Sequence, residues 1–280
     1  MNVKVVTDST ADLPPETVKE LGITVVPLYI LFGHDKFRDR VDISEDDFYD
    51  RLVKDPAHPT TTQPTPKDFT DCYQKLSKKA TAIVSIHISE KLSGTCNSAI
   101  HGAKQVKDGC PVEVIDSRTV SMALGLAVKA AAVMAKEGKG LKNIVAEVNR
   151  IINELDIMVI FDSLKYLAKG GRIGKAKALM GSLLNVKPVL KMKDGVFEPS
   201  GRVRNRAKGV QKLVNYAREA GEVKELAVIH STTPEEAGAL GLKIKPLLPG
   251  VEITIARLGP VLGVHGGPGV LAVALRGKPA

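Results

Sequence analysis

A dense group of hydroxyl side chains follows an apolar run in the segment IHISEKLSGTCNSA, residues 86–99. Its members are Ser89, Ser93, Thr95 and Ser98, with Gly94 among them. Ser93 and Gly94 stand where a helix is predicted to begin, and the free N–H groups and dipole of a helix start favour an anion such as a carboxylate. For an isolated serine, capping the helix is the commoner role. The segment therefore predicts a helix cap, a carboxylate site, or both.

Two other segments carry polar side chains that could join such a site. Thr60, Thr61 and Thr62 lie in a stretch with four prolines within residues 56–66, and prolines at that density predict an extended, ordered loop. Threonines in such a loop also serve turn chemistry. His265 lies in LGPVLGVHGGPG, whose glycines permit close backbone approach, although a histidine satisfied within the protein is the commoner explanation.

A run of basic residues near the middle of the second half is the densest in the chain. It comprises Arg202, Arg204, Arg206 and Lys208. In an extended chain the three arginines would face one side. A solvated surface is the usual explanation for such a run, so by itself it indicates no site.

Patterns typical of enzymes and metal sites are incomplete in this sequence. GGRIGKA, residues 170–176, lacks the glycine spacing of a phosphate-binding loop and has Ala176 where a Ser or Thr would meet magnesium. Ser93 and Gly94 resemble part of a nucleophile elbow, but Lys91 replaces its first glycine. The six histidines have no zinc-ligand spacing. We therefore expect neither a metal nor a cofactor.

The polar residues must be positioned by the secondary structure around them. In the first part of the chain, strand and helix signals alternate. Apolar strands are predicted at residues 3–6, 81–88 and 111–116, and a helical pattern follows each of them. Such alternation predicts a parallel sheet with helices on both faces. ITVVPLYILF, residues 23–32, is predicted to return to this sheet, and Ser44 has capping-box spacing before the next helix.

The second part of the chain has a different pattern. LAKGGRIGKAKALMGSLL, residues 167–184, predicts a glycine-punctuated loop and a helix. Asp194 and Gly195 mark the turn of a hairpin. Thr233 is predicted to cap a helix that begins at Pro234.

The length of 280 residues exceeds what one hydrophobic core usually organises, and 44% apolar residues suffice for two cores. We therefore expect an α/β protein of two domains. Residues 1–155 are predicted to form the domain with the parallel sheet and helices on both faces. Residues 156–280 are predicted to form an α/β domain with a mixed sheet and helices on one face.

The amino-acid composition indicates which class of binding partner and which cellular compartment to expect. The net charge of +9 and the pI near 9.3 are compatible with nucleic acid, but only 4% of residues are aromatic, which leaves few stacking platforms. The three cysteines form no CxxC pair, which fits a reducing compartment. The first residues lack a long apolar segment. We expect a soluble, cytoplasmic protein without stable membrane insertion.

Six segments, taken in order along the whole chain, resemble one known family. They are VVTDSTADLP, TTTQPTP, SEKLSGTCNSA, VIDSRTVSMALG, YLAKGGRIG followed by KPVL, and GPVLGVHGGPG. Together they resemble the DegV family of bacterial fatty-acid-binding proteins. The resemblance implies two α/β domains with a lipid between or beneath them, and a role as the acyl-carrying subunit of a fatty acid kinase system.

The resemblance also implies a set of ligand-binding residues. Ser93, which precedes Gly94 in the matching LSGT motif, would hold the fatty acid carboxylate. Thr61 and Thr62, which match a Thr-Ser pair in the family, and His265 in the terminal glycine motif would complete the polar site. Several hydrogen-bond donors are needed there, because an unpaired buried carboxylate is very costly.

Two arginines match family positions whose role the sequence leaves open. Arg172 in GGRIG and Arg202 in GRVR correspond to arginines associated with carboxylate positioning or with kinase docking. The chain also departs from the family pattern, because Val264 and Gly266 flank His265 where threonines are usual. The hydrogen-bond partners of His265 therefore stay open.

We predict a carrier that is not itself an enzyme. Its partners would be a long-chain fatty acid and a separate ATP-dependent fatty acid kinase that forms the acyl phosphate, with no nucleic acid and with transient membrane contact for ligand exchange. Two alternatives belong to other classes. One is an acyl hydrolase that uses Ser93 and His265, and the other is a nucleic-acid-binding module suggested by the positive charge.

Overall fold

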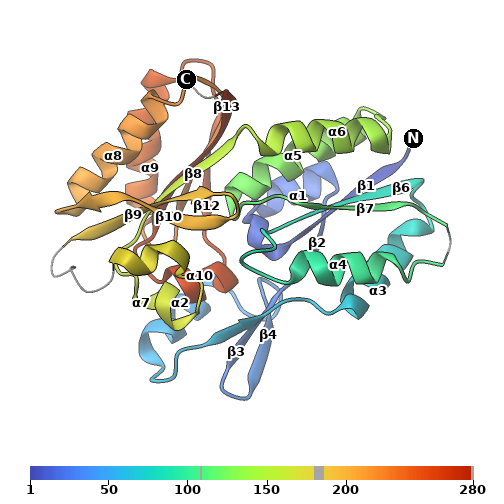
Figure 1. Ribbon diagram of the computed structural model, residues 1–280, viewed down its shortest axis with the longest axis horizontal. Helices are drawn as coiled ribbons and strands as arrows, with labels where there is room; N and C mark the ends of the chain where they lie inside the picture. Colours follow the sequence, from blue (N-terminus) through green and yellow to red (C-terminus); the bar gives the residue numbers. More distant parts are fainter. Residues whose placement is uncertain (108, 180–185, 279–280) are drawn as a thin grey trace.

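The computed structural model describes residues 1–107, 109–179 and 186–278. Within these ranges the strands form three sheets (Figure 1). One is parallel and built from the first part of the chain, and a larger mixed one is built from the second part. The predicted α/β fold class is therefore confirmed. Its division into two domains at residue 155 stays a prediction, although the first strand of the larger sheet begins at that residue.

The first sheet is parallel and has the strand order β2-β1-β6-β7. Its strands are β1 (Val3–Asp8), β2 (Thr24–Val26), β6 (Ala82–His87) and β7 (Val112–Asp116). The helices that accompany it are α1 (Pro15–Leu21), α3 (Pro66–Ser77), α4 (Thr95–Ala103), α5 (Met122–Lys136) and α6 (Leu141–Ile152). Apolar side chains of α3 and α4 cover one face, and those of α5 and α6 cover the other. Every residue of β6 is buried, as expected for a strand covered on both faces.

The larger sheet has the order β10-β9-β8-β13-β11-β12, and only β11 and β12 pair in parallel among its described strands. The strands are β8 (Leu155–Ile160), β9 (Lys187–Lys193), β10 (Val196–Val203), β11 (Glu222–His230), β12 (Ile253–Arg257) and β13 (Leu271–Lys278). Helices α8 (Arg206–Arg218) and α9 (Pro234–Ile244) cover one face, and the opposite face packs on α5. Asp194 and Gly195, with φ of 48° and 80°, form the predicted hairpin turn between β9 and β10.

A third sheet, which is antiparallel, contradicts two of the predictions made from the sequence. It has the order β4-β3-β5 and consists of β3 (Tyr29–Phe32), β4 (Asp35–Arg38) and β5 (Thr60–Thr62). Residues 23–32 therefore do not return as one strand to the parallel sheet, because the chain leaves it at Pro27, which has no N–H for a ladder. The threonines predicted to lie in a loop form β5 instead, because their extended backbone pairs with β3.

The third sheet supports the helix that carries the terminal glycine motif. Helices α2 (Glu45–Lys54) and α10 (Pro260–Gly266) pack with it around a core that includes Phe48, Val261 and Val264. Ser44 caps α2 by accepting a hydrogen bond from the Asp47 N–H, as its spacing predicts. The small sheet, α2 and α10 thus hold β5 beside the chain around residue 265.

Two predicted features near helix ends differ from the structure. The segment at 167–184 contains the short helix α7 (Lys165–Lys169) and the 3-10 turn η2 (Gly174–Leu179), and its part from residue 180 lies outside the described residues. Thr233 precedes α9, with Pro234 in the first position as predicted, but its buried hydroxyl makes no capping hydrogen bond. Two further 3-10 turns are η1 (Ser9–Ala11) and η3 (Lys245–Leu247). In the part of the chain that is described, no helix is both long and apolar enough to span a membrane.

Candidate functional site

The carboxyl edge of the parallel sheet carries several polar side chains. Asp8 ends β1, Ser89 and Ser93 follow β6, and Ser121 follows β7. Parallel strands end at one edge of a sheet, which is where α/β proteins commonly bind ligands.

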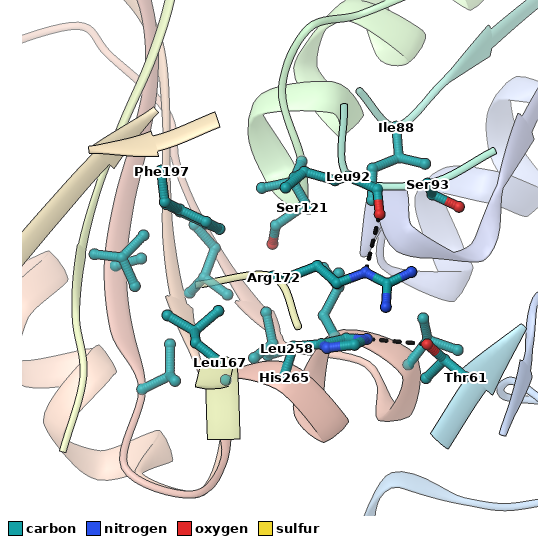
Figure 2. Close-up of a pocket in the computed structure, with 18 of the residues that line it drawn as sticks. Thr61, Ile88, Leu92, Ser93, Ser121, Leu167, Arg172, Phe197, Leu258 and His265 are labelled. Atoms are coloured by element: carbon teal, nitrogen blue, oxygen red, sulfur yellow. Dashed lines mark hydrogen bonds between the residues drawn. The ribbon is translucent and has the colours of Figure 1, made fainter. Parts of the chain in front are cut away.

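A pocket opens beside this edge, between the parallel sheet, α10 and the larger sheet (Figure 2). Its volume is about 950 Å³ including the open mouth, within the range of small-molecule sites. Leucine, isoleucine, valine, phenylalanine and alanine side chains form most of its wall. The polar side chains that line it are Thr61, Thr62, Gln63, Ser93, Ser121, Arg172 and His265. The pocket is therefore apolar along most of its wall, and Thr61, Ser93, Arg172 and His265 gather on one side in Figure 2.

Thr61 and His265 meet at this polar side although 204 positions separate them in the chain. The Thr61 Oγ1 of β5 lies 2.9 Å from the His265 Nε2 of α10. Burial lowers the pKa of His265 to about 4, and the positive charge of Arg172 and His58 acts in the same direction. The imidazole is therefore neutral near pH 7. Its hydrogen-bond partner, which the sequence left open, is Thr61.

The imidazole of His265 also packs directly on the backbone of Gly170. A Cβ at residue 170 would lie 2.0 Å from Nδ1 and 2.7 Å from Cε1 of the ring, so a side chain there would collide with it. The next residue, Gly171, has φ of +69°, which favours glycine for a different reason. The two glycines of GGRIG thus serve close packing and a left-handed turn.

Arg172 lies at the mouth between Ser93 and His265 (Figure 2). Its Nε donates to the Leu92 carbonyl at 3.2 Å, and its Nη1 donates to the Gly170 carbonyl at 2.8 Å. These two bonds fix the plane of an otherwise exposed guanidinium. Its second amino group, Nη2, makes no hydrogen bond to any described residue and is available to an anion in the pocket.

Ser93 lines the pocket but does not cap the following helix, so the capping prediction is wrong. Helix α4 begins at Thr95 with Gly94 as its N-terminal cap residue, and no side chain bonds the first turn. The Ser93 Oγ lies 2.8 Å from the Thr95 Oγ1 instead. Gly94 does not line the pocket, and a Cβ there would lie 2.4 Å from Nε2 of Gln63. Its lack of a side chain makes room for Gln63.

The remaining predicted residues take different positions. Thr62 lines the pocket, and its hydroxyl donates to the Gln63 carbonyl over 3.4 Å. Arg202 is exposed on β10 and does not line the pocket. Arg206 does not continue an exposed row with Arg202, because it begins α8 and pairs with Glu236.

Ser121 is a pocket residue that the sequence analysis did not single out. It is buried, with φ of 56° and ψ of −146°, a conformation that residues other than glycine rarely adopt. Its hydroxyl donates to Oδ2 of Asp12 over 2.6 Å, and Oδ1 of Asp12 accepts from the Gly259 N–H at 2.9 Å. Asp12 thereby joins the pocket wall to the start of α10. The position of Ser121 before a helix was the only sequence signal.

Two buried carboxyl groups surround Arg40 beside this junction. Burial raises the pKa of Asp12 to about 6 and that of Asp39 to about 7, while the charge of Arg40 opposes both shifts. Arg40 also donates to the Arg257 carbonyl at 2.7 Å. The cluster joins the η1 turn, the β4 end and the β12 end behind the pocket.

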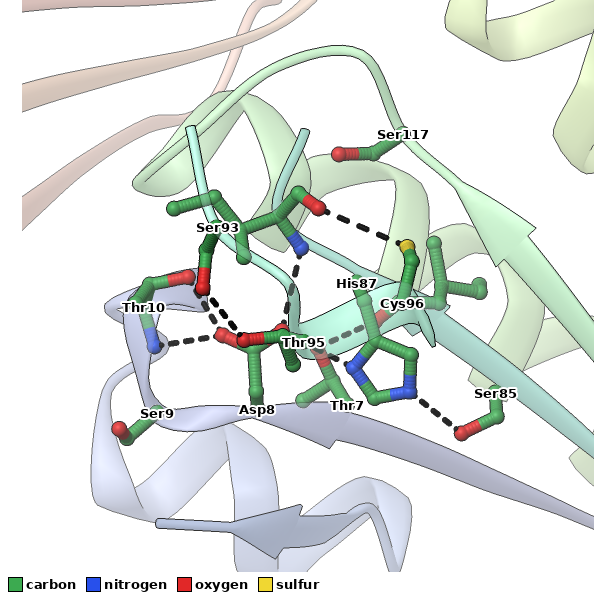
Figure 3. A network of polar contacts seen from close by, with 12 residues as sticks. Thr7, Asp8, Ser9, Thr10, Ser85, His87, Ser93, Thr95, Cys96 and Ser117 are labelled. Atoms are coloured by element: carbon green, nitrogen blue, oxygen red, sulfur yellow. Dashed lines mark hydrogen bonds and ion pairs between the residues drawn. The ribbon is translucent and has the colours of Figure 1, made fainter. Parts of the chain in front are cut away.

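A second polar network lies behind the loop that carries Ser93 (Figure 3). His87 Nδ1 lies 2.9 Å from Oδ2 of Asp8, and His87 Nε2 lies 2.7 Å from Oγ of Ser85. The same Asp8 oxygen accepts the Ile88 N–H at 3.1 Å. The side chains of Asp8, Ser85 and His87 are inaccessible to solvent, so this Ser-His-Asp array holds β6 against β1 and does not face a substrate.

The hydrolase alternative lacks the required geometry. A serine nucleophile needs a histidine base within hydrogen-bond reach and a third group that orients the base. Ser93 bonds to Thr95, whereas His265 bonds to Thr61, and Nδ1 of His265 has no hydrogen-bond partner among the described residues. The pair therefore does not form a nucleophile and base.

Comparisons with known proteins agree with the resemblance seen in the sequence. Residues 2–278 match the model of a family described as "Uncharacterised protein, DegV family". A DegV domain-containing protein of Deinococcus radiodurans is 36% identical, with 98% of each chain covered. The structure described as "Fatty Acid Binding of a DegV family Protein from Thermus thermophilus" has a TM-score of 0.92 at 33% identity, covering 99% of this chain and 100% of that one. A stearic acid-binding protein of Eubacterium ventriosum has a TM-score of 0.89 at 28% identity, covering 98% of each chain.

Proposed function

The chain belongs to the DegV family, and we propose that it holds a long-chain fatty acid in the pocket beside the parallel sheet. The observation that carries this proposal is the distribution of the lining residues, with hydrogen-bonding groups gathered on one side of an otherwise apolar cavity. A fatty acid has the same division into a charged head and an apolar chain. The related proteins of Thermus thermophilus and Eubacterium ventriosum are described as binding fatty acids.

The head group would lie between Ser93, Thr61, His265 and Arg172. The hydroxyl of Ser93, the Thr61–His265 pair and the free Nη2 of Arg172 offer donors to a carboxylate, each such bond contributing about 1.5–3 kcal/mol. Thr62 lines the same pocket, where its hydroxyl would have to leave the long bond to the Gln63 carbonyl to reach a carboxylate, and the N–H groups after Gly94 are those of an uncapped helix start. Burial of the acyl chain would contribute about 0.8 kcal/mol of binding free energy for each methylene group.

The proposal extends to a carrier that is not itself an enzyme. A separate ATP-dependent kinase would transfer the γ-phosphoryl group of ATP to a carboxylate oxygen, releasing ADP and leaving the acyl phosphate in the pocket. A head group at the mouth, beside the exposed Arg172, would be within reach of such a partner.

The charge of one segment supports a docking role. Residues 163–212 carry thirteen lysines and arginines against two carboxylates, an excess of eleven, although Lys187 and Arg206 pair with carboxylates outside the segment. Arg202 lies exposed within this segment, so we assign it to kinase docking and Arg172 to carboxylate positioning.

Native mass spectrometry of the purified protein tests the binding proposal. We expect a complex with one fatty acid, whose identity is read after denaturation. Ser93→Ala should weaken binding of added oleate by about 10- to 150-fold, the loss of one charge-assisted hydrogen bond. Ser98→Ala is the matched control, because Ser98 lies nearby in helix α4 but does not line the pocket. A protein that carries no fatty acid and gains none on addition of oleate or palmitate would refute the proposal.

A further inference from the structure

Phe197 lines the side of the pocket that lies opposite Thr61 and Ser93 (Figure 2). In Figure 2 its ring stands at the far side of the cavity from Thr61 and Ser93. Phe197 belongs to β10, in the larger sheet, whereas Ser93 belongs to the loop after β6. A chain whose head lies at Ser93 and Thr61 would therefore run toward this ring.

The ring has little freedom to move aside. Phe161, the residue after β8, contacts it edge-on, with the ring centroids 6.0 Å apart and the ring planes at 90°. Both side chains are buried, with exposed fractions of 3% for Phe161 and 9% for Phe197. The backbone of Phe197 pairs with Met192 in the β9–β10 hairpin. The ring is thus a fixed wall held by a sheet and an aromatic neighbour.

Apolar side chains that do not line the pocket lie next to this ring. Met192 lies directly opposite Phe197 in the hairpin, so both project from the same face of the sheet. Leu190, two residues earlier on the same face, and Leu179 of η2 belong to the same hydrophobic cluster as Phe197. None of Met192, Leu190 and Leu179 lines the pocket. The part of the protein next to the ring and outside the pocket lining is therefore apolar.

We propose that Phe197 sets the longest fatty acid that the pocket accepts, an inference that rests on the proposed fatty-acid-binding function. The terminal methyl group of the best-fitting chain would contact the ring. A longer chain could enter only by displacing Phe197 from its contact with Phe161. Replacing the ring by a small side chain would extend the cavity toward Leu179, Leu190 and Met192, where additional methylenes find an apolar environment.

A competition experiment tests this role. Wild-type protein and Phe197→Ala are each incubated with an equimolar mixture of the even-numbered saturated acids from tetradecanoic to docosanoic acid, and the complexes are weighed by native mass spectrometry. We expect the preferred acid of Phe197→Ala to be at least two carbons longer than that of the wild type. Its preference for that acid over the wild-type optimum should change by about 15-fold, since each additional buried methylene strengthens binding about 4-fold.

Two further variants make the result decisive. Phe197→Leu keeps an apolar side chain and serves if the alanine variant does not fold, with a smaller shift in the same direction. Phe37→Ala is the control, because Phe37 is a partly buried aromatic residue of β4 outside the pocket, and it should keep the wild-type length profile. An unchanged profile in the folded Phe197 variants, or an equal shift in Phe37→Ala, would overturn the inference. A wild type that binds none of the acids would overturn the proposed function itself.

Discussion

Replacement of Gly170 by alanine is expected to disable the polar end of the pocket without unfolding the protein. The ideal Cβ at this position would lie 2.0 Å from Nδ1 of His265, whereas ordinary contact begins near 3.4 Å. The ring would therefore have to move by roughly 1.4 Å. It cannot slide straight away from Gly170, because Nε2 at the opposite side of the ring is already 2.9 Å from the Thr61 hydroxyl.

The ring must turn out of its present position, and the Thr61–His265 arrangement is then lost. If that pair supplies one hydrogen bond to a bound carboxylate, affinity falls by about 1.5–3 kcal/mol, or about 10- to 150-fold. Folding should suffer little, since Gly170 has φ of −78° and ψ of −3°, which alanine adopts readily. Displacement titration with a fluorescent fatty acid measures the affinity, and ligand-free thermal unfolding measures the stability.

The adjacent glycine provides a matched control with the opposite expectation. Gly171 has φ of +69° and open space around its Cα, so Gly171→Ala introduces backbone strain but no collision with His265. It should lower the melting temperature and leave the affinity of the folded protein nearly unchanged. Wild-type affinity in Gly170→Ala would refute the argument that close packing on residue 170 holds His265 in a ligand-binding position.

Two other predictions concern charge. Arg202→Ala should leave fatty-acid binding intact and slow phosphorylation of the bound acid by the cognate kinase. The control Lys243→Ala, at an exposed position of α9, should affect neither binding nor phosphorylation. If Arg202→Ala lowers fatty-acid affinity together with the phosphorylation rate, Arg202 belongs to the ligand site. For Asp39, burial raises the pKa from 3.8 to about 7, so the neutral carboxyl stabilises the fold at low pH, and this contribution disappears as the pH rises through about 7. Denaturant unfolding should therefore show Asp39→Asn gaining stability over the wild type by at most about 1.4 kcal/mol per pH unit between pH 4 and pH 7, and parallel pH profiles would contradict the shift.

Local sequence patterns were sufficient to predict the parallel sheet and the hydroxyl groups at its edge. Strand and helix periodicity are properties of short segments, and the residues that follow parallel strands gather at one edge whatever the rest of the chain does. The hairpin turn at Asp194 and Gly195 was equally predictable from the sequence, because its residue types adopt positive φ. The N-terminal cap of α4 was less predictable. Serine is common at helix starts, but the hydroxyl of Ser93 bonds to Thr95. The helix begins at Thr95, and its N-terminal cap residue is Gly94.

Long-range pairings were not available from any pattern in the sequence. Thr61 meets His265 only because β5 pairs with β3 in a small sheet that packs on α10, and no periodicity specifies that sheet. The GGRIG glycines were first compared with a phosphate loop, whereas Gly170 is needed for contact with a ring almost a hundred residues away. The contact of Ser121 with Asp12 is of the same kind. The resemblance to a family named Thr61 and His265 as parts of one polar site, but it gave no indication of Ser121 or of the contact between Gly170 and the ring.

The origin of the pocket residues has a consequence for how the protein would hold a fatty acid. The proposed head-group donors come from β5, the loop after β6, the turn after α7 and α10, and the proposed end wall comes from β10. A fatty acid that contacts all of them would bind only when the parallel sheet, the small sheet and the larger sheet are assembled. Ligand and fold therefore stabilise each other by mass action, because a molecule that binds only the folded state shifts the equilibrium toward it. In this proposal the same assembly separates the two tasks of the site, since the head group would be held by segments packed around α10, while the length of the acyl chain would be limited by a ring in a different sheet.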